Sequence, residues 1–272
     1  MPSPNSITVS QLSRLIGTPD APVILDVRID EDVDEDPRLV PAARRVAYQD
    51  MAHQVTSLKN CRVVVICHRG KKLSEGAVAV LRERGVSAEK LVGGHVAWRE
   101  AGEMLVPIKC VPSCDSSGRT VWVTRHRPKI DRIACPWLIR RFIDPDAQFL
   151  FVSPAEVMAV AEHFSATPFD IEDVFWSHRE DRCTFDTMIE EFALRSSALK
   201  HLATIVRGAD TNRHQLAPEA AGLLAVSLGL SRQYRDDTQQ LNAGMAIYDA
   251  FYRWTRDARD EMHDWPSESG SK

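Results

Sequence analysis

The sequence predicts two domains: an α/β domain built on a parallel sheet, followed by a mostly helical α+β domain. Strand-like and helix-like segments alternate through the first third of the 272 residues, which is typical of βα units. After Thr120 most apolar residues recur at helical spacing instead. From 102 to 120 both periodicities are lost, and Pro, Ser and Gly accumulate. We therefore predict domains at 1–105 and 121–262, a linker at 106–120 and a disordered tail at 263–272.

Two strands that look buried on both faces define the first domain. The runs at 23–28 and 62–66 are rich in β-branched apolar residues, as covered strands of parallel sheets are. A helix is expected at 74–84, where apolar residues recur at helical spacing. A short strand at 90–92 then runs into Gly93-Gly94.

The second domain is expected to contain two strands and several helices. The strands lie at 121–124 and 148–152. Cys135-Pro136 is typical of an N-cap followed by Pro at the first helical position, so a helix is expected to run from there to about Phe142. The remaining helices are expected at 154–162, 184–193, 198–206, 218–228 and 237–262.

Composition narrows the class of protein. The net charge is -4, from 34 Lys and Arg against 38 Asp and Glu, so no excess of positive charge points to nucleic acid or an anionic membrane. The first residues lack the pattern of a secretory signal, and no apolar stretch approaches the ~18 residues of a membrane helix. The six cysteines follow no disulfide framework. We expect a cytoplasmic protein with free thiols, no membrane partner and no nucleic-acid partner.

One thiol, Cys67, follows the strand at 62–66 directly and opens a short basic loop. Ligands of open α/β sheets bind at the carboxyl ends of the strands, so Cys67 is the candidate nucleophile. The helix that follows, with its N-terminal dipole, and the basic loop residues favour a thiolate. The alternative is a buried structural cysteine at a strand end.

Three landmarks make the N-terminal domain resemble the rhodanese/sulfurtransferase family over residues 6–105. They are Asp26-Val27-Arg28 at a strand end, the loop that begins Cys67-His68-Arg69-Gly70, and Gly93-Gly94 followed by Trp98, Ala101 and Gly102. The resemblance implies that Cys67 takes a sulfane sulfur as a persulfide and passes it to a thiol acceptor, without a cofactor. The active-site loop consists of His68, Arg69, Gly70, Lys71, Lys72 and Leu73. Its N–H groups and the side chains of Arg69, Lys71 and Lys72 can hold the thiolate, the persulfide and a small anionic sulfur donor.

Two features depart from the family pattern. The segment 38–43 stands where the family has G-H-I-P-G-A, and it lacks those glycines. The loop looks one residue longer than in common sulfurtransferases, as it is in related phosphatases and arsenate reductases. Those enzymes end the loop with an arginine that grips phosphate bidentately, whereas this chain has Leu73 there. A phosphatase is therefore disfavoured.

From Trp122 to about Trp254 the chain resembles the C-terminal domain of ChrB-type chromate-resistance proteins. The segments that carry the resemblance are 122–144, 205–210 and 216–224. The resemblance implies a role in chromate tolerance without specifying the chemistry. The N-terminal, DNA-binding part of such regulators is replaced here by the rhodanese-like domain, which weakens a transcriptional role.

The second domain begins with a stretch rich in cations. Residues 119–141 hold seven Arg and Lys residues against the single acid Asp131. Such a cluster suits a divalent oxyanion such as chromate or sulfate. The candidate residues are Arg125, Lys129, Arg132, Arg140, Arg141 and, further along the chain, Arg207. The alternative is that these side chains are solvated or paired with acids elsewhere.

A histidine and three carboxylates form a candidate metal site for iron, manganese or zinc in the same domain. They are His178, Asp186, Glu190 and Asp210. Asp186 and Glu190 lie four residues apart and share a helix face. His201 or His214 could substitute for His178, and ordinary helix-face charges are the alternative interpretation.

The sequence as a whole predicts a thiosulfate-type sulfurtransferase that acts through Cys67 and is coupled to a chromate-resistance domain. Two other functions stay open at this point. Both domains could sense chromate, with Cys67 as a redox switch. Alternatively, Cys67 could reduce an oxyanion such as chromate, with Cys110 or Cys114 as the resolving thiol.

Overall fold

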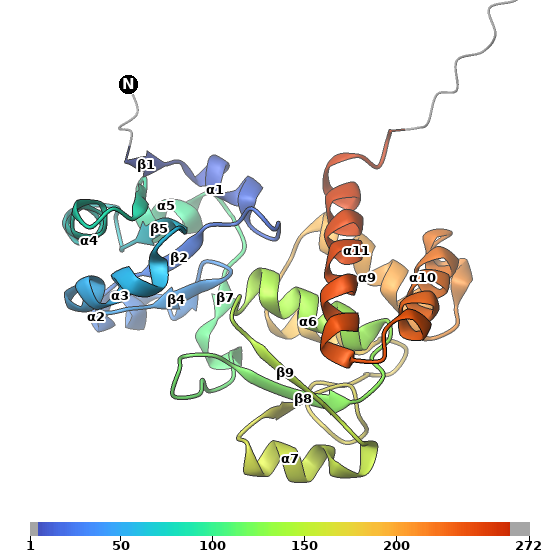
Figure 1. The fold of residues 1–272 in the computed structure, drawn as a ribbon. Coiled ribbons are helices and arrows are strands. Elements are labelled where there is room, and N and C mark those ends of the chain that lie inside the picture. Colours follow the sequence, from blue (N-terminus) through green and yellow to red (C-terminus); the bar gives the residue numbers. More distant parts are fainter. Residues whose placement is uncertain (1–4, 262–272) are drawn as a thin grey trace, which may run out of the picture.

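A computed structural model describes residues 5–261 (Figure 1). The N-terminal α/β domain and the more helical C-terminal domain pack side by side. This arrangement confirms the predicted fold class. The predicted tail at 263–272 lies outside the described residues.

The N-terminal domain contains a parallel five-stranded sheet with the strand order β1-β6-β5-β2-β4. Its strands are β1 (Ser6–Ile7), β2 (Val23–Asp26), β4 (Ala43–Arg45), β5 (Arg62–Ile66) and β6 (Ser87–Leu91). The two strands predicted to be buried, β5 and β2, are neighbours, and Asp26 pairs with Ile66. Their carboxyl ends therefore meet at one edge of the sheet.

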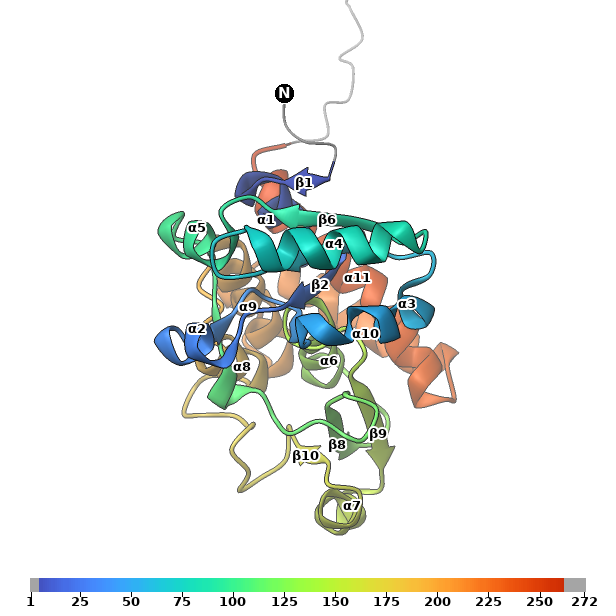
Figure 2. The same ribbon diagram turned by 90° about the vertical axis from the view of Figure 1, so that its left-hand side faces the viewer.

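Helices cover both faces of this sheet (Figure 2). They are α1 (Val9–Leu15), α2 (Asp30–Glu35), α3 (Met51–Leu58), α4 (Lys72–Glu83) and α5 (Gly94–Glu100), with a 3-10 turn at Tyr48–Asp50. Alternate β5 residues enter different cores: Val63 and Val65 pack with Leu81 of α4, whereas Val64 packs with Trp98 of α5. Burial on both faces explains why β5 is a continuous apolar run.

The segment expected to be a linker begins with a strand. β7 (Val106–Pro107) pairs antiparallel with β3 (Arg38–Leu39), and a 3-10 turn follows at Ile108–Cys110. Residues 38–39, which lack the glycines of the family pattern, thus tie the start of the predicted linker to the first domain.

The C-terminal domain combines a parallel three-stranded sheet, order β10-β8-β9, with a group of helices. The strands are β8 (Val121–Arg125), β9 (Gln148–Val152) and β10 (Thr167–Pro168). The helices are α6 (Asp131–Phe142), α7 (Val157–His163), α8 (Thr184–Glu191), α9 (Ser197–Asp210), α10 (Glu219–Gln233) and α11 (Asp237–Asp257), with 3-10 turns at Pro154–Glu156 and His214–Leu216.

Helix α6 begins five residues before the predicted start, so the expected Cys135 N-cap is wrong. Its first turn is closed by the backbone, because Ile133 and Ala134 both donate to the carbonyl of Ile130. Pro136 therefore lies inside the helix, where its ring removes one bond of the helical ladder. Nine of the twelve residues of α6 are buried, and this packing outweighs the local preference.

The two domains share one continuous buried cluster that runs from β2 to α11. The Ala42 amide donates to the Phe142 carbonyl at 2.6 Å, and Arg256 donates to the Arg14 carbonyl at 3.1 Å. A Cβ on Gly17 would lie 2.4 Å from the Phe142 ring. Because backbone and core contacts both cross the boundary, the domains meet through a packed interface.

Within residues 5–261, no helix is both long and apolar enough to cross a membrane.

Candidate functional site

Cys67 follows the last residue of β5, and its sulfur lies against the first turn of α4. The side chain is 4% exposed, and Sγ lies 3.2 Å from Oγ of the buried Ser74. The Ser74 hydroxyl also reaches the Lys71 carbonyl at 3.1 Å. The structure thus places this thiol at the carboxyl edge of the sheet, facing a helix N-terminus.

The loop after Cys67 is held by the Gly93-Gly94 segment. The amides of His95 and Val96 donate to the carbonyls of Cys67 and His68, both at 3.0 Å. Gly94 has a φ of +63°, and a Cβ there would lie 2.2 Å from the Cys67 carbonyl oxygen. Only glycine allows this approach, so the second and third sequence landmarks form one structural unit.

Helix α4 begins inside the segment predicted to be a loop. It starts at Lys72, two residues before the predicted start, so Lys72 and Leu73 belong to its first turn. Leu73 is half-buried against the core beneath α4, which explains why an apolar residue stands there. The irregular part of the loop therefore runs from Cys67 to Lys71, and its extra residue relative to common sulfurtransferases stays a prediction.

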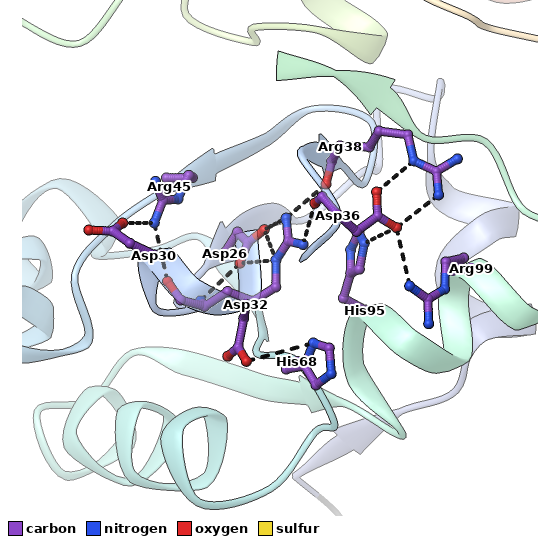
Figure 3. Close-up of polar contacts among 10 residues, drawn as sticks. Asp26, Asp30, Asp32, Asp36, Arg38, Arg45, His68, His95 and Arg99 are labelled. Atoms are coloured by element: carbon purple, nitrogen blue, oxygen red, sulfur yellow. Dashed lines mark hydrogen bonds and ion pairs between the residues drawn. The ribbon is translucent and has the colours of Figure 1, made fainter. Parts of the chain in front are cut away.

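Cations surround the mouth of the loop. Arg69, Lys71 and Lys72 are exposed and form no ion pair with any residue in the range 5–261. His68 of the same loop lies 3.9 Å from Asp32 of α2 (Figure 3) and 3.8 Å from Glu35. The entrance therefore has both cationic and acidic side chains.

The Asp26 and Arg28 landmark is a buried ion pair that does not contact Cys67. The two side chains are 2% and 0% exposed and lie 2.7 Å apart. Arg28 also donates to the carbonyls of Asp36 and Arg38, at 3.0 and 2.7 Å. This pair therefore anchors the segment between α2 and β3.

A second buried network surrounds Asp36 (Figure 3). Arg38 approaches its carboxylate at 2.6 Å, His95 at 3.1 Å and Arg99 at 3.6 Å. Burial raises the pKa of Asp36, but the hydrogen bonds from Arg38 and His95 prevail and lower it to about 2. Burial and the charge of Arg28 lower the pKa of His95, which favours the neutral imidazole.

A groove of about 480 Å³ opens at the same edge of the sheet as Cys67. Residues that follow β2 and β4 line it: Arg28, Ile29, Asp30, Glu31, Arg45, Val46, Ala47, Tyr48 and Gln49. An exposed ion pair between Arg45 and Asp30, at 2.7 Å, lies on its wall (Figure 3).

A second polar cluster lies at the carboxyl ends of β8 and β10 in the C-terminal domain. Nε2 of His178 lies 3.5 Å from Asp131, 3.3 Å from Asp170 and 3.2 Å from Asp210. Asp131 is the first residue of α6, Asp170 follows β10, and Asp210 ends α9. We call these four residues the Asp131 cluster.

The Asp131 cluster is crowded with negative charge. Its histidine is 42% exposed, whereas Asp131 is fully buried. Hydrogen bonds to Asp131, Asp170 and Asp210 raise the pKa of His178 to about 12. Burial and the charge of Asp210 raise the pKa of Asp131 to about 7.

The structure brings together only half of the predicted metal ligands. His178 and Asp210 are in contact, but Asp186 pairs with Arg207 at 3.0 Å, and Glu190 pairs with Arg182 at 2.6 Å. Asp131 and Asp170 were not among the predicted ligands. Asp131 stands out in the sequence as the single acid in a cationic stretch, whereas Asp170 has no sequence signal beyond its position after a short strand.

The cations predicted to form an oxyanion site are spread over different partners. Arg125 and Arg132 both approach Asp170, at 3.4 and 3.2 Å. Arg141 pairs with Asp249, and Arg140 stacks 5.1 Å from the Phe149 ring. Arg207 forms an ion pair with Asp186, and Lys129 is half-buried. An oxyanion site on these residues stays a prediction.

All six cysteines are free thiols, as predicted. Cys110 is half-buried and Cys114 is exposed. The pKa of Cys110 is raised by burial and by Glu191, and that of Cys114 by burial and by Asp144. Both therefore favour the protonated thiol over the reactive thiolate.

The topology and the Cys67 loop define a parallel α/β domain that resembles rhodanese-like domains, joined to a helical domain that contains the Asp131 cluster. Residues 122–255 match the family model described as "ChrB, C-terminal domain". The second domain is therefore similar to the C-terminal domain of ChrB proteins. Over 132 residues the chain is 33% identical to "Protein ChrB" of Cupriavidus metallidurans. The match covers 48% of this chain and 39% of that relative.

Solved structures similar to this chain include two rhodanese-type proteins. A rhodanese-like domain protein from Staphylococcus aureus is 29% identical, with a TM-score of 0.31, and the similarity covers 35% of this chain and 90% of that one. A rhodanese-related protein from Thermoplasma volcanium is 23% identical, with a TM-score of 0.33 and coverage of 38% and 97%.

Proposed function

We propose that the N-terminal domain transfers sulfane sulfur through Cys67, from a small anionic donor to a thiol acceptor. The position of the Cys67 sulfur carries this proposal. It lies at the carboxyl end of β5 and 3.2 Å from Ser74 in the first turn of α4. Ligands of parallel sheets bind at this edge, and a helix N-terminus stabilises negative charge beside it.

The charges around the loop support an anionic donor such as thiosulfate. Arg69, Lys71 and Lys72 are exposed and unpaired within the described chain, so they are available to attract an anion. Within the same domain, Arg28 and Arg38 are committed to Asp26 and Asp36. No ion pair within the described chain therefore competes with a bound anion for these three side chains.

The reaction we propose consists of two displacements. The Cys67 thiolate attacks the outer sulfur of thiosulfate, a new S–S bond forms, and the S–S bond of the donor breaks as sulfite leaves with the electron pair. An acceptor thiolate then attacks the outer sulfur of the Cys67 persulfide. That S–S bond breaks in turn, and Cys67 leaves as the thiolate. Neither step requires a metal or cofactor.

We propose that the acceptor enters through the groove at this edge of the sheet, which Cys67 and residues 68–73 do not line. It opens at the carboxyl ends of β2 and β4, next to the strand that ends at Cys67. We further propose that the C-terminal domain, which is similar to that of ChrB proteins, links this sulfur chemistry to chromate tolerance.

Thiocyanate formation from thiosulfate and cyanide tests the proposal. We expect activity in the wild-type protein and background activity in Cys67→Ser. Cys61→Ser is the matched control, because this half-buried thiol precedes the same strand at its other end. After incubation with thiosulfate, intact mass spectrometry should show the mass of one added sulfur atom on wild type but not on Cys67→Ser.

A wild-type protein that forms neither thiocyanate nor a persulfide would overturn sulfur transfer. The interpretation of Cys67 as a redox switch would then take its place.

A further inference from the structure

The Asp131 cluster lies outside the sulfur-transfer site and has an incomplete set of partners. Asp131 and Asp210 form no ion pair with any arginine or lysine among residues 5–261. Asp131 is 0% exposed, and its Oδ1 has no hydrogen-bond partner in the described chain. A buried carboxylate oxygen without a partner is costly, and it indicates that something else binds there.

The rest of the cluster is already oriented by neighbouring groups. The Thr184 amide donates to Oδ2 of Asp131 at 2.6 Å, and its hydroxyl donates to Oδ1 of Asp170 at 2.8 Å. Arg132 holds the other oxygen of Asp170 at 3.2 Å. These contacts hold the carboxylates in place, as outer partners do in metal sites.

The distances suit a small divalent cation. Bonds of about 2.1 Å to oxygen and nitrogen place adjacent ligand atoms about 3.0–3.4 Å apart. The His178 nitrogen lies 3.2, 3.3 and 3.5 Å from the three carboxylates. One ligand atom each from Asp131, Asp170 and His178 falls within 4.8 Å of the others.

We propose that Asp131, Asp170 and His178 bind one divalent first-row transition metal, with Asp210 beside the site through its contact with His178. Two carboxylates and one imidazole, with a third carboxylate nearby, suit Mn²⁺, Fe²⁺ or Zn²⁺. His178 releases its proton to solvent when it binds the metal, and the cation then neutralises the carboxylates of Asp131 and Asp210, which pair with no arginine or lysine among residues 5–261. His178 is 42% exposed, so it closes the site on the solvent side and leaves a path for the metal.

The site occupies a position where ligands are expected from the topology. Asp131 begins the helix that follows β8, and Asp170 follows β10, the parallel neighbour of β8. The carboxyl ends of these strands and the start of α6 therefore converge on one point. Asp170 itself has a φ of +51°, and Ile130, before Asp131, has a φ of +41°. This strained backbone is consistent with a site retained for binding rather than for stability.

Metal binding by the full-length protein tests the inference. After chelation and dialysis, titration with Mn²⁺, and separately with Zn²⁺, should give about one metal per chain by elemental analysis. It should also raise the melting temperature by at least about 3 °C, because the metal binds only the folded site. His178→Gln should weaken binding at least about 10-fold, and its half-exposed position allows the variant to fold. Asp131→Asn should do the same.

Glu190→Gln is the matched control, because this exposed carboxylate on α8 pairs with Arg182 and should leave binding unchanged. The inference is overturned if folded wild-type protein takes up neither metal. It is equally overturned if His178→Gln binds as tightly as wild type. Neither result affects thiocyanate formation, so this test is independent of the sulfur-transfer proposal.

Discussion

The two polar clusters of this chain differ in how completely their buried charges are matched. In the N-terminal domain Asp26 is paired with Arg28, and Asp36 with Arg38 and His95. In the C-terminal domain three carboxylates converge on the single imidazole of His178. A satisfied network specifies and supports a fold, whereas an unsatisfied one points to a bound group. We therefore interpret the first cluster as a scaffold for the Cys67 loop, and the second as the metal site proposed above.

The largest expected effect tests the scaffold. Arg28→Met leaves Asp26 as a buried charge without a partner, and it removes the donors to two backbone carbonyls. We expect the free energy of unfolding to fall by about 3–5 kcal/mol, measured by urea denaturation. Arg45→Met is the control, since its pair with Asp30 is exposed and should cost less than about 1 kcal/mol.

The double variant Asp26→Asn/Arg28→Met should recover part of the loss, because no charge is left buried. Equal losses in Arg28→Met and Arg45→Met would show that the buried pair is not a scaffold.

An intermediate effect is expected in acid. The pKa of Asp36 is about 2 in the folded protein and 3.8 as its ordinary value, so its contribution to stability is complete above about pH 4 and is lost as the pH falls toward 2. The pKa of buried His95 is also lowered from 6.5, so the unfolded chain gains its proton first and stability begins to fall below that pH.

Melting temperatures between pH 7 and 2 would measure this dependence. Asp36→Asn should flatten the part between pH 4 and 2. The control Asp34→Asn, on exposed α2 surface, should follow wild type. An unchanged profile in Asp36→Asn would remove Asp36 from the acid response.

The smallest effect concerns the loop cations. Lys72→Ala should raise the KM for thiosulfate about 3- to 10-fold, which corresponds to about 1 kcal/mol of binding free energy. The kcat should stay unchanged, because an exposed cation attracts the bound donor and the transition state equally. Added salt should reduce the difference. Arg62→Ala is the control, since this residue begins β5 at the far edge and pairs with Glu89 at 2.8 Å. If both variants keep the wild-type KM, the donor does not approach through the loop cations.

The strands were predicted best where local sequence and the folded environment favour the same structure. The run 62–66 predicted β5 with the observed bounds, and Cys67 was placed correctly at its carboxyl end. The strand at 148–152 was also predicted residue for residue. In these segments the apolar pattern and the folded environment agree, so local residues are sufficient.

Helix starts were predicted least well, because tertiary packing there outweighs the preference of the local sequence. Pro136 was expected to begin a helix, but the burial of α6 carries the helix through it from Asp131. Leu73 was interpreted as a loop position, although it packs against the core from the first turn of α4. Helix ends depend on what the flanking residues contact in three dimensions, and periodicity does not contain that information.

The sequence alone was enough to determine the α/β and helical architecture, the position of Cys67 at the end of β5 and the glycines that hold its loop, because each depends on short-range patterning. The sequence placed His178 and Asp210 in one candidate site, but the other two members of the Asp131 cluster, Asp131 and Asp170, emerged only from the fold. The residues of the cluster come from four separate segments, and Asp131 and Asp210 meet only because α6 and α9 pack together around His178. Long-range packing decides which carboxylates share a site, and nothing in the spacing of acids along the chain specifies it.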